Sequence, residues 1–162
     1  MKICNSEIMK KIKLLDQQKA NLILEERRIR EVTYQTEKDK IDYNYSFSDT
    51  RNKISEIDSE TRKLKHLLNY SNAFTVVEGF NMTIGECLIY MAQLNNEKYI
   101  LEEMSNIPQT SRHSTVNGVI EYTELNYDRA ECQEKLFNLN EELAKLQIAI
   151  DRANLTNLID IG

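Results

Sequence analysis

Hydrophobic residues in the last quarter of the chain recur every fourth and then every third position. This heptad pattern runs through Leu125, Arg129, Cys132, Leu136, Leu139, Leu143, Leu146, Ile150 and Ala153, with polar residues at most positions between them. A period of 3.5 residues keeps one apolar stripe on one side of a helix, which is typical of helices that pack lengthwise. A helix of this length, roughly 43 Å, needs long partner helices to cover its stripe.

Related patterns predict those partners. In the first part of the chain the heptad is apolar except at Lys19 and Glu26. A second stripe follows from residue 54 and a third from residue 84, where Thr83 and Glu86 have the spacing of a capping box. The sequence therefore predicts four helices, at about residues 6–32, 49–70, 83–105 and 124–156.

Two segments between the helices have the pattern of β-hairpins. Ile41, Tyr43, Tyr45 and Phe47 alternate with polar residues, which predicts a half-buried strand within a hairpin at about 32–47. Asn-Gly at 117–118, between β-branched residues, is a strong two-residue turn signal and predicts a second hairpin at about 111–123.

These elements define the expected fold. The chain has 162 residues, with four glycines and one proline, so turn signals are few and long helices are favoured. We expect a mainly α fold, with long antiparallel helices in a coiled-coil-like bundle and one or two inserted β-hairpins. The length predicts a single helical domain over residues 1–162.

Charge and hydropathy narrow the class of partner. The net charge is −5 and the pI is about 5.2, which argues against general affinity for nucleic acid. The basic residues Arg62, Lys63 and Lys65 follow the acidic Asp58 and Glu60, and we expect them to lie on a solvated helix face. No apolar run approaches the roughly 20 residues of a membrane span. The N-terminus lacks the apolar core of a secretion signal, so we expect a cytoplasmic protein with three reduced cysteines.

Part of the chain resembles a known family. The segments that carry the resemblance are LLNYSN at 67–72, TVVEG at 75–79, MTI at 82–84, Arg112 with Ser114, and LAKLQIAIDRANLT at 143–156. These resemble strings found in a family of small bacterial and phage helical proteins that are often labelled septicolysin-like, over about residues 65–159. The resemblance implies a helical, oligomeric protein and implies no established reaction.

The sequence predicts no metal, cofactor or catalytic site. His66 and His113 are the two histidines, and no cysteine stands at zinc-ligand spacing from another ligand. Nucleophile elbows, phosphate-binding loops and HExxH motifs are all missing. Cys132 falls on the apolar stripe, where we expect it to be a core residue. We therefore expect a protein without enzymatic activity.

The second hairpin and its junction with the last helix form the candidate site. The residues predicted to bind a ligand there are Arg112, His113, Ser114, Thr115, Tyr122, Tyr127 and Arg129. An arginine fork among hydroxyls suits an anion or a nucleotide-like molecule, and the tyrosine rings suit stacking. The alternative is that these side chains simply solvate a hairpin.

Three functions follow from this sequence. The first is a non-enzymatic homo-oligomeric scaffold or binding protein, which presents its hairpin loops to a partner or ligand. The alternative is a small-molecule sponge that sequesters a nucleotide-like signalling molecule, as in phage anti-defence. The third, an enzyme of unknown class, lacks any supporting motif.

Overall fold

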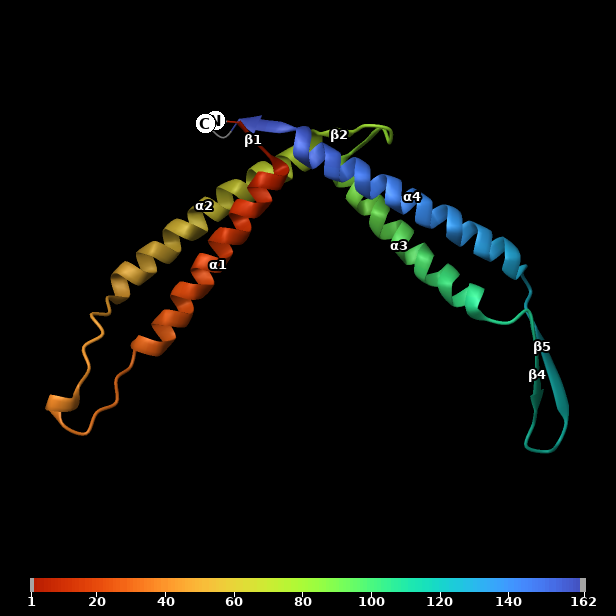
Figure 1. Ribbon diagram of the computed structural model, residues 1–162, viewed down its shortest axis with the longest axis horizontal. Helices are drawn as coiled ribbons and strands as arrows, with labels where there is room; N and C mark the ends of the chain where they lie inside the picture. The colour runs from red at the N-terminus through yellow and green to blue at the C-terminus, as the bar shows by residue number, and fades with distance from the viewer. Residues whose placement is uncertain (1, 161–162) are drawn as a thin grey trace. The chain divides into compact units, whose positions relative to one another are not determined.

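The computed structural model describes residues 2–160, and over that range the chain is mainly α (Figure 1). The helices are α1 (Asn5–Ile29), α2 (Phe47–Phe74), α3 (Ile84–Asn106) and α4 (Arg129–Thr156), with a short 3₁₀ turn η1 (Glu37–Asp39). The strands are β1 (Lys2–Cys4), β2 (Val76–Val77), β3 (Met82–Thr83), β4 (Thr110–Ser114), β5 (Ile120–Glu124) and β6 (Leu158–Asp160). They pair antiparallel as β1–β6, β2–β3 and β4–β5. The predicted fold class, long helices with a small inserted hairpin, is confirmed.

Residue contacts divide the chain into two compact units. Unit 1 consists of Met1–Asn72 with Asn154–Gly162, and unit 2 consists of Ala73–Ala153. The single domain predicted over residues 1–162 stays a prediction. Across the described range, no helix has both the length and the apolar character to cross a membrane.

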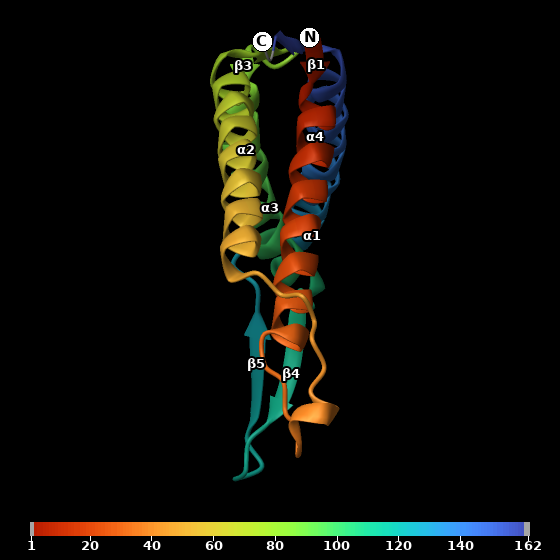
Figure 2. The same cartoon turned by 90° about the vertical axis from the view of Figure 1, so that its left-hand side faces the viewer.

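In unit 1, α1 and α2 lie side by side and antiparallel (Figures 1 and 2). Their shared core contains Ile3, Ile8, Ile12 and Leu64, and Leu67, Leu68 and Ile159 pack against it. The apolar residues come from one stripe on each helix, as the sequence pattern predicts. This core lies toward the end of unit 1 that β1 and β6 close.

The two polar positions in the heptad of α1 are ion-pair positions. Lys19 Nζ lies 2.7 Å from a carboxylate oxygen of Asp58 on α2. Glu26 binds the guanidinium of Arg51, also on α2, and accepts a hydrogen bond of 2.6 Å from the Tyr45 hydroxyl. These contacts hold the helices together where apolar residues are missing from the seam.

A buried asparagine joins three segments of unit 1. Asn5 is fully buried at the start of α1. Its Nδ2 donates to Asn154 Oδ1 at 3.0 Å and to Asn72 Oδ1 at 3.4 Å, near the ends of α4 and α2. Asn157 Nδ2 donates to Ser71 Oγ at 3.0 Å beside it. A buried amide is stabilised by such bonds, so this cluster fixes how the three helix ends meet.

The prediction of a first β-hairpin at residues 32–47 is wrong. In the structure this segment contains only the turn η1 and irregular chain, and Phe47 already belongs to α2. Asn44 has φ +49°, which interrupts any strand, and its N–H donates to Asp42 Oδ1 at 2.8 Å. The hydrogen bond from Tyr45 to Glu26 turns this ring toward α1 instead of onto a sheet face. A lone two-stranded hairpin is marginal in water, and these contacts with the helix replace it.

In unit 2, α3 and α4 form an antiparallel pair. The start of α3 packs against the end of α4 in a cluster of Val77, Ile84, Cys87, Leu146 and Ile150, and the end of α3 packs against the start of α4 through Leu101, Cys132 and Leu139. Every heptad residue from Cys132 to Ala153 is buried or half-buried, which confirms the predicted seam. The predicted capping box is also present, because the Thr83 N–H donates to Glu86 Oε2 at 2.7 Å and the Glu86 N–H to Thr83 Oγ1 at 3.2 Å.

The observed helix ends differ from the predicted ones by a few residues. α4 begins at Arg129 instead of 124, because β5 continues to Glu124 and a short link follows. α1 ends at Ile29 instead of 32, and α2 runs over 47–74 instead of 49–70. The hydrogen bond between Asn157 and Ser71 lies in the added turn of α2.

Candidate functional site

The β4–β5 hairpin extends beyond the ends of α3 and α4, as the sequence predicts (Figure 1). Its turn is closed at Thr115, whose N–H donates to the carbonyl oxygen of Val119 at 2.8 Å, and the Gly118 N–H donates to the carbonyl oxygen of Thr115 at 2.9 Å. Gly118 has φ +75°, whereas Asn117 is not in the left-handed region. The loop therefore has three residues, with one glycine in the position that favours glycine, instead of a two-residue turn.

The register separates the predicted ligand-binding residues onto two faces. Arg112 pairs with Tyr122, and Ser114 pairs with Ile120, so these side chains share one face of the hairpin. His113 lies on the opposite face, where its Nε2 is 2.9 Å from the Ser111 hydroxyl. The structure thus brings Arg112, Ser114 and Tyr122 together on one exposed face and places His113 away from them.

Thr115 has a role in the turn. Its hydroxyl lies 3.1 Å from the carbonyl oxygen of Val119, to which it donates, and also accepts from the Val119 N–H at 3.1 Å. These bonds close the loop. Thr115 therefore stabilises the hairpin and is not placed beside Arg112.

Tyr127 and Arg129 connect the hairpin junction to the end of α3. The Tyr127 hydroxyl donates to the carbonyl oxygen of Met104 at 2.8 Å, and Arg129 Nε donates to the carbonyl oxygen of Ser105 at 2.7 Å. Gln109 adds a bridge, because its Nε2 donates to the carbonyl oxygen of Tyr127 and its Oε1 accepts from the Arg129 N–H, both at 3.1 Å. Carbonyl groups in the last turn of a helix need donors from elsewhere. The polar break that Arg129 makes in the seam is therefore a helix cap.

The cysteines are structural. Cys4, Cys87 and Cys132 are free and buried. Burial raises the pKa of the Cys87 thiol, which suppresses its thiolate, and Cys132 Sγ lies 3.5 Å from the carbonyl oxygen of Leu101. Among residues 2–160, no group of three or more His, Cys, Asp or Glu side chains is placed to hold a metal ion.

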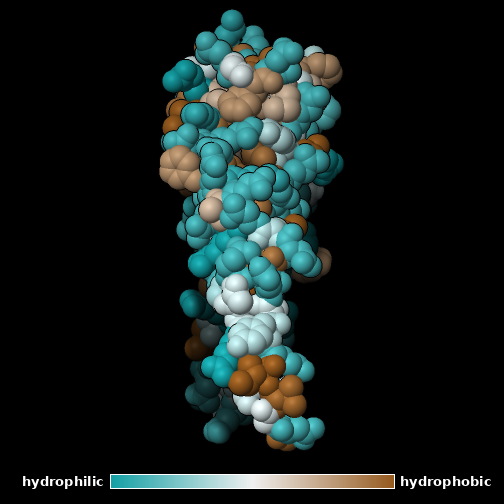
Figure 3. Space-filling view, turned by 90° about the vertical axis from the view of Figure 1, so that its right-hand side faces the viewer, coloured by the Kyte–Doolittle hydropathy of each residue, from teal (hydrophilic) through white to brown (hydrophobic). Residues whose placement is uncertain are grey.

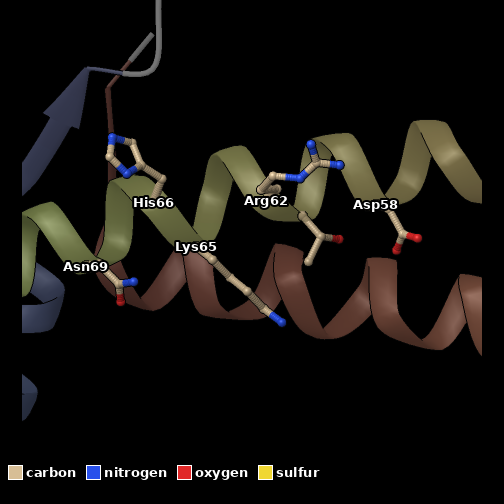
Figure 4. A pocket seen from close by; sticks show the side chains of 6 residues that line it. Asp58, Arg62, Lys65, His66 and Asn69 are labelled. Carbon is tan, nitrogen blue, oxygen red and sulfur yellow. The ribbon is translucent and has the colours of Figure 1, made fainter.

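A shallow groove of about 580 Å³ lies along α2 in unit 1 (Figure 4). Its lining residues are Asp58, Thr61, Arg62, Lys65, His66 and Asn69. His66 points to one side of α2 and Lys65 to the other, so these two lining side chains do not converge. Asp58 is already paired with Lys19. The groove is consistent with the solvated helix face predicted from the sequence.

The sequence reasoning missed a second apolar surface on unit 2. On α4, Phe137 and Ile148 are 63% and 61% exposed. At 3.6 residues per turn they lie about 140° and 160° around the helix from Cys132, opposite the seam. On α3, Ile89 and Ile100 are also exposed, but they lie on the side of α3 that faces away from α4 and form a separate surface. We call Phe137 and Ile148 the outer apolar face. The signal in the sequence is the spacing of Phe137, Ala144 and Ile148 by seven and four residues.

Comparisons with known proteins support the fold. No protein-family description and no curated protein matches the chain. A crystal structure of a functionally unknown conserved protein from Corynebacterium diphtheriae is similar, with a TM-score of 0.68 at 16% identity, over 99% of this chain and 100% of that one. At this identity the likeness concerns the fold alone. The resemblance to the septicolysin-like family stays a prediction.

Proposed function

We propose that this protein is a non-enzymatic homo-oligomeric scaffold, whose helix pairs self-associate and whose loops present a binding surface to a partner or ligand. The observation that carries the proposal is the outer apolar face of unit 2. Phe137 and Ile148 are exposed although α4 is already packed against α3 on its seam side. Burying a large apolar side chain contributes about 1.5–3 kcal/mol, so covering both of them favours association.

The occupant that we propose for this face is a second copy of the chain. α3 carries apolar residues all around its circumference, which is typical of a helix covered on more than one side. Phe137 and Ile148 stand about three turns apart, so the outer apolar face extends along α4. A helix pair of this kind matches another helix pair of equal length, as in a four-helix arrangement.

Light scattering after size exclusion tests the proposal. The wild-type chain is expected at a multiple of 19.0 kDa. Phe137→Glu places a charge on the outer apolar face and is expected to shift the mass to the monomer. Asn138→Glu is the matched control, because this neighbouring residue is exposed about 100° further around α4 and should leave the mass unchanged. A wild-type monomer at micromolar concentration would overturn the proposal.

The second candidate is the sponge for a nucleotide-like molecule. The observation that favours it is the pairing of Arg112 with Tyr122, which places an arginine and a tyrosine directly opposite each other on one exposed face. A thermal-shift screen with mononucleotides and cyclic nucleotides tests it, with Arg112→Ala as the binding-deficient variant. Absence of stabilisation by every nucleotide leaves the scaffold as the function.

The proposal also includes the cellular compartment in which the protein folds and acts. We infer a reducing, cytoplasmic location, because three cysteines remain as thiols in the described chain. Buried thiols of this kind need no oxidising environment for folding. Expression in the cytoplasm and in an exported form, followed by a comparison of oligomer mass and free thiol content, tests this location.

A further inference from the structure

The outer edge of β5 carries backbone groups that β4 does not use. In the hairpin ladder, Thr115 bonds to Val119 and Leu125 bonds to Gln109. Hydrogen-bonded pairs alternate in an antiparallel ladder, so the odd-numbered residues of β5 direct their N–H and C=O groups toward β4. Ile120, Tyr122 and Glu124 therefore direct theirs outward. Within residues 2–160, β5 pairs only with β4.

The hairpin also exposes hydrophobic side chains. Val116 is completely exposed at the loop, and Val119, Ile120 and Tyr122 are exposed along β5. Figure 3 shows the brown atoms of hydrophobic residues gathered at the end of the molecule where the hairpin lies. A two-stranded hairpin without a covered face is marginal in water, and an open strand edge is a template for another strand.

The side chains at the centres of the two strands make self-pairing less favourable for β4 than for β5. β4 carries Arg112 at its centre, so two β4 strands paired antiparallel about that centre would place arginine opposite arginine. β5 carries Tyr122 at its centre. Pairing two β5 strands about Tyr122 places tyrosine opposite tyrosine, Ile120 opposite Glu124, and Glu121 opposite Thr123.

The register centred on Glu121 is less favourable. It would place two carboxylates directly opposite each other, which is destabilising. The Tyr122-centred register also uses all three outward-facing residues of β5 as hydrogen-bonded positions, since Tyr122 faces itself and Ile120 faces Glu124. It is thus the register in which the whole strand is paired and no like charges are opposed.

We propose that a second copy of this chain pairs with the outer edge of β5, antiparallel and centred on Tyr122, so that two hairpins form a four-stranded sheet. The inference rests on the self-association proposed above and names the strand that takes part. The arrangement is isologous and closes after two copies. On one face of this sheet the Arg112–Tyr122 pairs of the two copies lie side by side.

A pair of proline variants of the full chain tests the edge. The N–H groups of Tyr122 and Arg112 both point outward from the hairpin, so Tyr122→Pro and Arg112→Pro each remove one outward donor without removing a bond of the internal ladder. Sedimentation equilibrium is expected to show self-association weakened by about tenfold or more for Tyr122→Pro, and little changed for Arg112→Pro. Equal effects of the two variants overturn the proposal.

Disulfide trapping gives an independent readout. Opposed residues in a hydrogen-bonded antiparallel pair have Cα atoms about 5.5 Å apart, which is within disulfide range. Tyr122→Cys is expected to form a disulfide-linked dimer under mild oxidation, and Arg112→Cys to remain monomeric on a non-reducing gel. The three native cysteines are buried and serve as an internal background. Failure of Tyr122→Cys to cross-link, or equal cross-linking of Arg112→Cys, overturns the strand pairing.

The experiments distinguish self-association through the outer apolar face from pairing of the β5 edges. If Phe137→Glu gives a monomer while Tyr122→Pro leaves the mass and the dissociation constant unchanged, the scaffold stands and the strand pairing is wrong. If Tyr122→Pro separates the copies while Phe137→Glu does not, the strand pairing stands and the outer apolar face is not the interface.

Discussion

Arg129 Nε donates to the carbonyl oxygen of Ser105 at 2.7 Å, so a residue in the first turn of α4 caps the last turn of α3. This contact spans 24 residues of sequence. It explains why an arginine interrupts an otherwise apolar heptad. It also makes the base of the hairpin a fixed junction, since Tyr127 and Gln109 bond in the same region.

Removing this cap is expected to destabilise the fold. Arg129→Ala leaves the Ser105 carbonyl without its charged donor, and we expect the free energy of unfolding to fall by about 1–3 kcal/mol. Chemical denaturation measures the change. Gln133→Ala, one turn further along α4 and exposed, is the control and should stay within about 0.5 kcal/mol of wild type. Equal losses for both variants would contradict the capping role.

The seam and the outer apolar face of α4 are expected to respond differently to truncation. Leu146 is fully buried between α3 and α4, so Leu146→Ala should lower the free energy of unfolding by about 2–5 kcal/mol. Ile148 lies two residues away and is exposed. At concentrations where the chain is monomeric, its replacement by alanine should change the free energy of unfolding little. Ile148→Ala should instead weaken self-association. Denaturation and sedimentation of the two variants, compared side by side, check both expectations.

The hairpin turn depends on the backbone conformation of one glycine. A Cβ at Gly118 would meet nothing within 4 Å, so a substitution there is disfavoured by the φ of +75° and not by crowding. Gly118→Ala is expected to destabilise the hairpin by about 1–2 kcal/mol. Hydrogen exchange of the β4 and β5 amides measures the loss of protection. Asn117→Ala should leave protection nearly unchanged, and protection lost equally in both variants would show that φ is not the cause.

The contact between Tyr45 and Glu26 predicts a dependence of stability on pH. The hydrogen bond from the Tyr45 hydroxyl is the main cause that lowers the pKa of the Glu26 carboxyl below 4.5, and the Arg51 guanidinium acts in the same direction. A carboxyl with a lowered folded-state pKa stabilises the fold above its unfolded pKa. That contribution is lost as the pH falls through the folded-state pKa.

Tyr45→Phe is therefore expected to raise the pKa of Glu26 toward its ordinary value and to reduce the loss of stability on acidification below about pH 4.5. Carbon-detected NMR titration of the Glu26 carboxyl measures the pKa directly. Tyr43→Phe is the matched control, because Tyr43 is a nearby exposed tyrosine in the same segment. An equal rise of the Glu26 pKa in the control would rule out the hydrogen bond as the cause.

The features that the sequence predicted correctly are those whose signal is local or periodic. The seam of α4 was predictable because each heptad position from Cys132 to Ala153 carries an apolar side chain. The second hairpin was predictable because Gly118 and its β-branched neighbours specify the turn within a few residues. The capping box of α3 likewise involves only Thr83 and Glu86.

The features that could not be predicted from the sequence depend on contact partners that lie far away along the chain. Alternation at Ile41, Tyr43 and Tyr45 is a valid strand pattern, but Glu26, 19 residues earlier than Tyr45, determines where that ring lies. Tyr127 was grouped with the ligand-binding residues because its ring suits stacking, and Arg129 because it breaks the apolar seam close to the hairpin. Their partners, Met104 and Ser105, become visible only when the two helices are folded together.

The pairing of β1 with β6 has a consequence for the order of events during biosynthesis. Ile3 is synthesised before the whole of unit 2, and its strand partner Ile159 is synthesised after it. Unit 1 therefore cannot complete its end closure until translation has passed residue 160, whereas all of unit 2, Ala73–Ala153, is already synthesised by then. Since domains generally fold as units during synthesis, the continuous unit is the one that can mature first on the nascent chain, and the discontinuous one follows it.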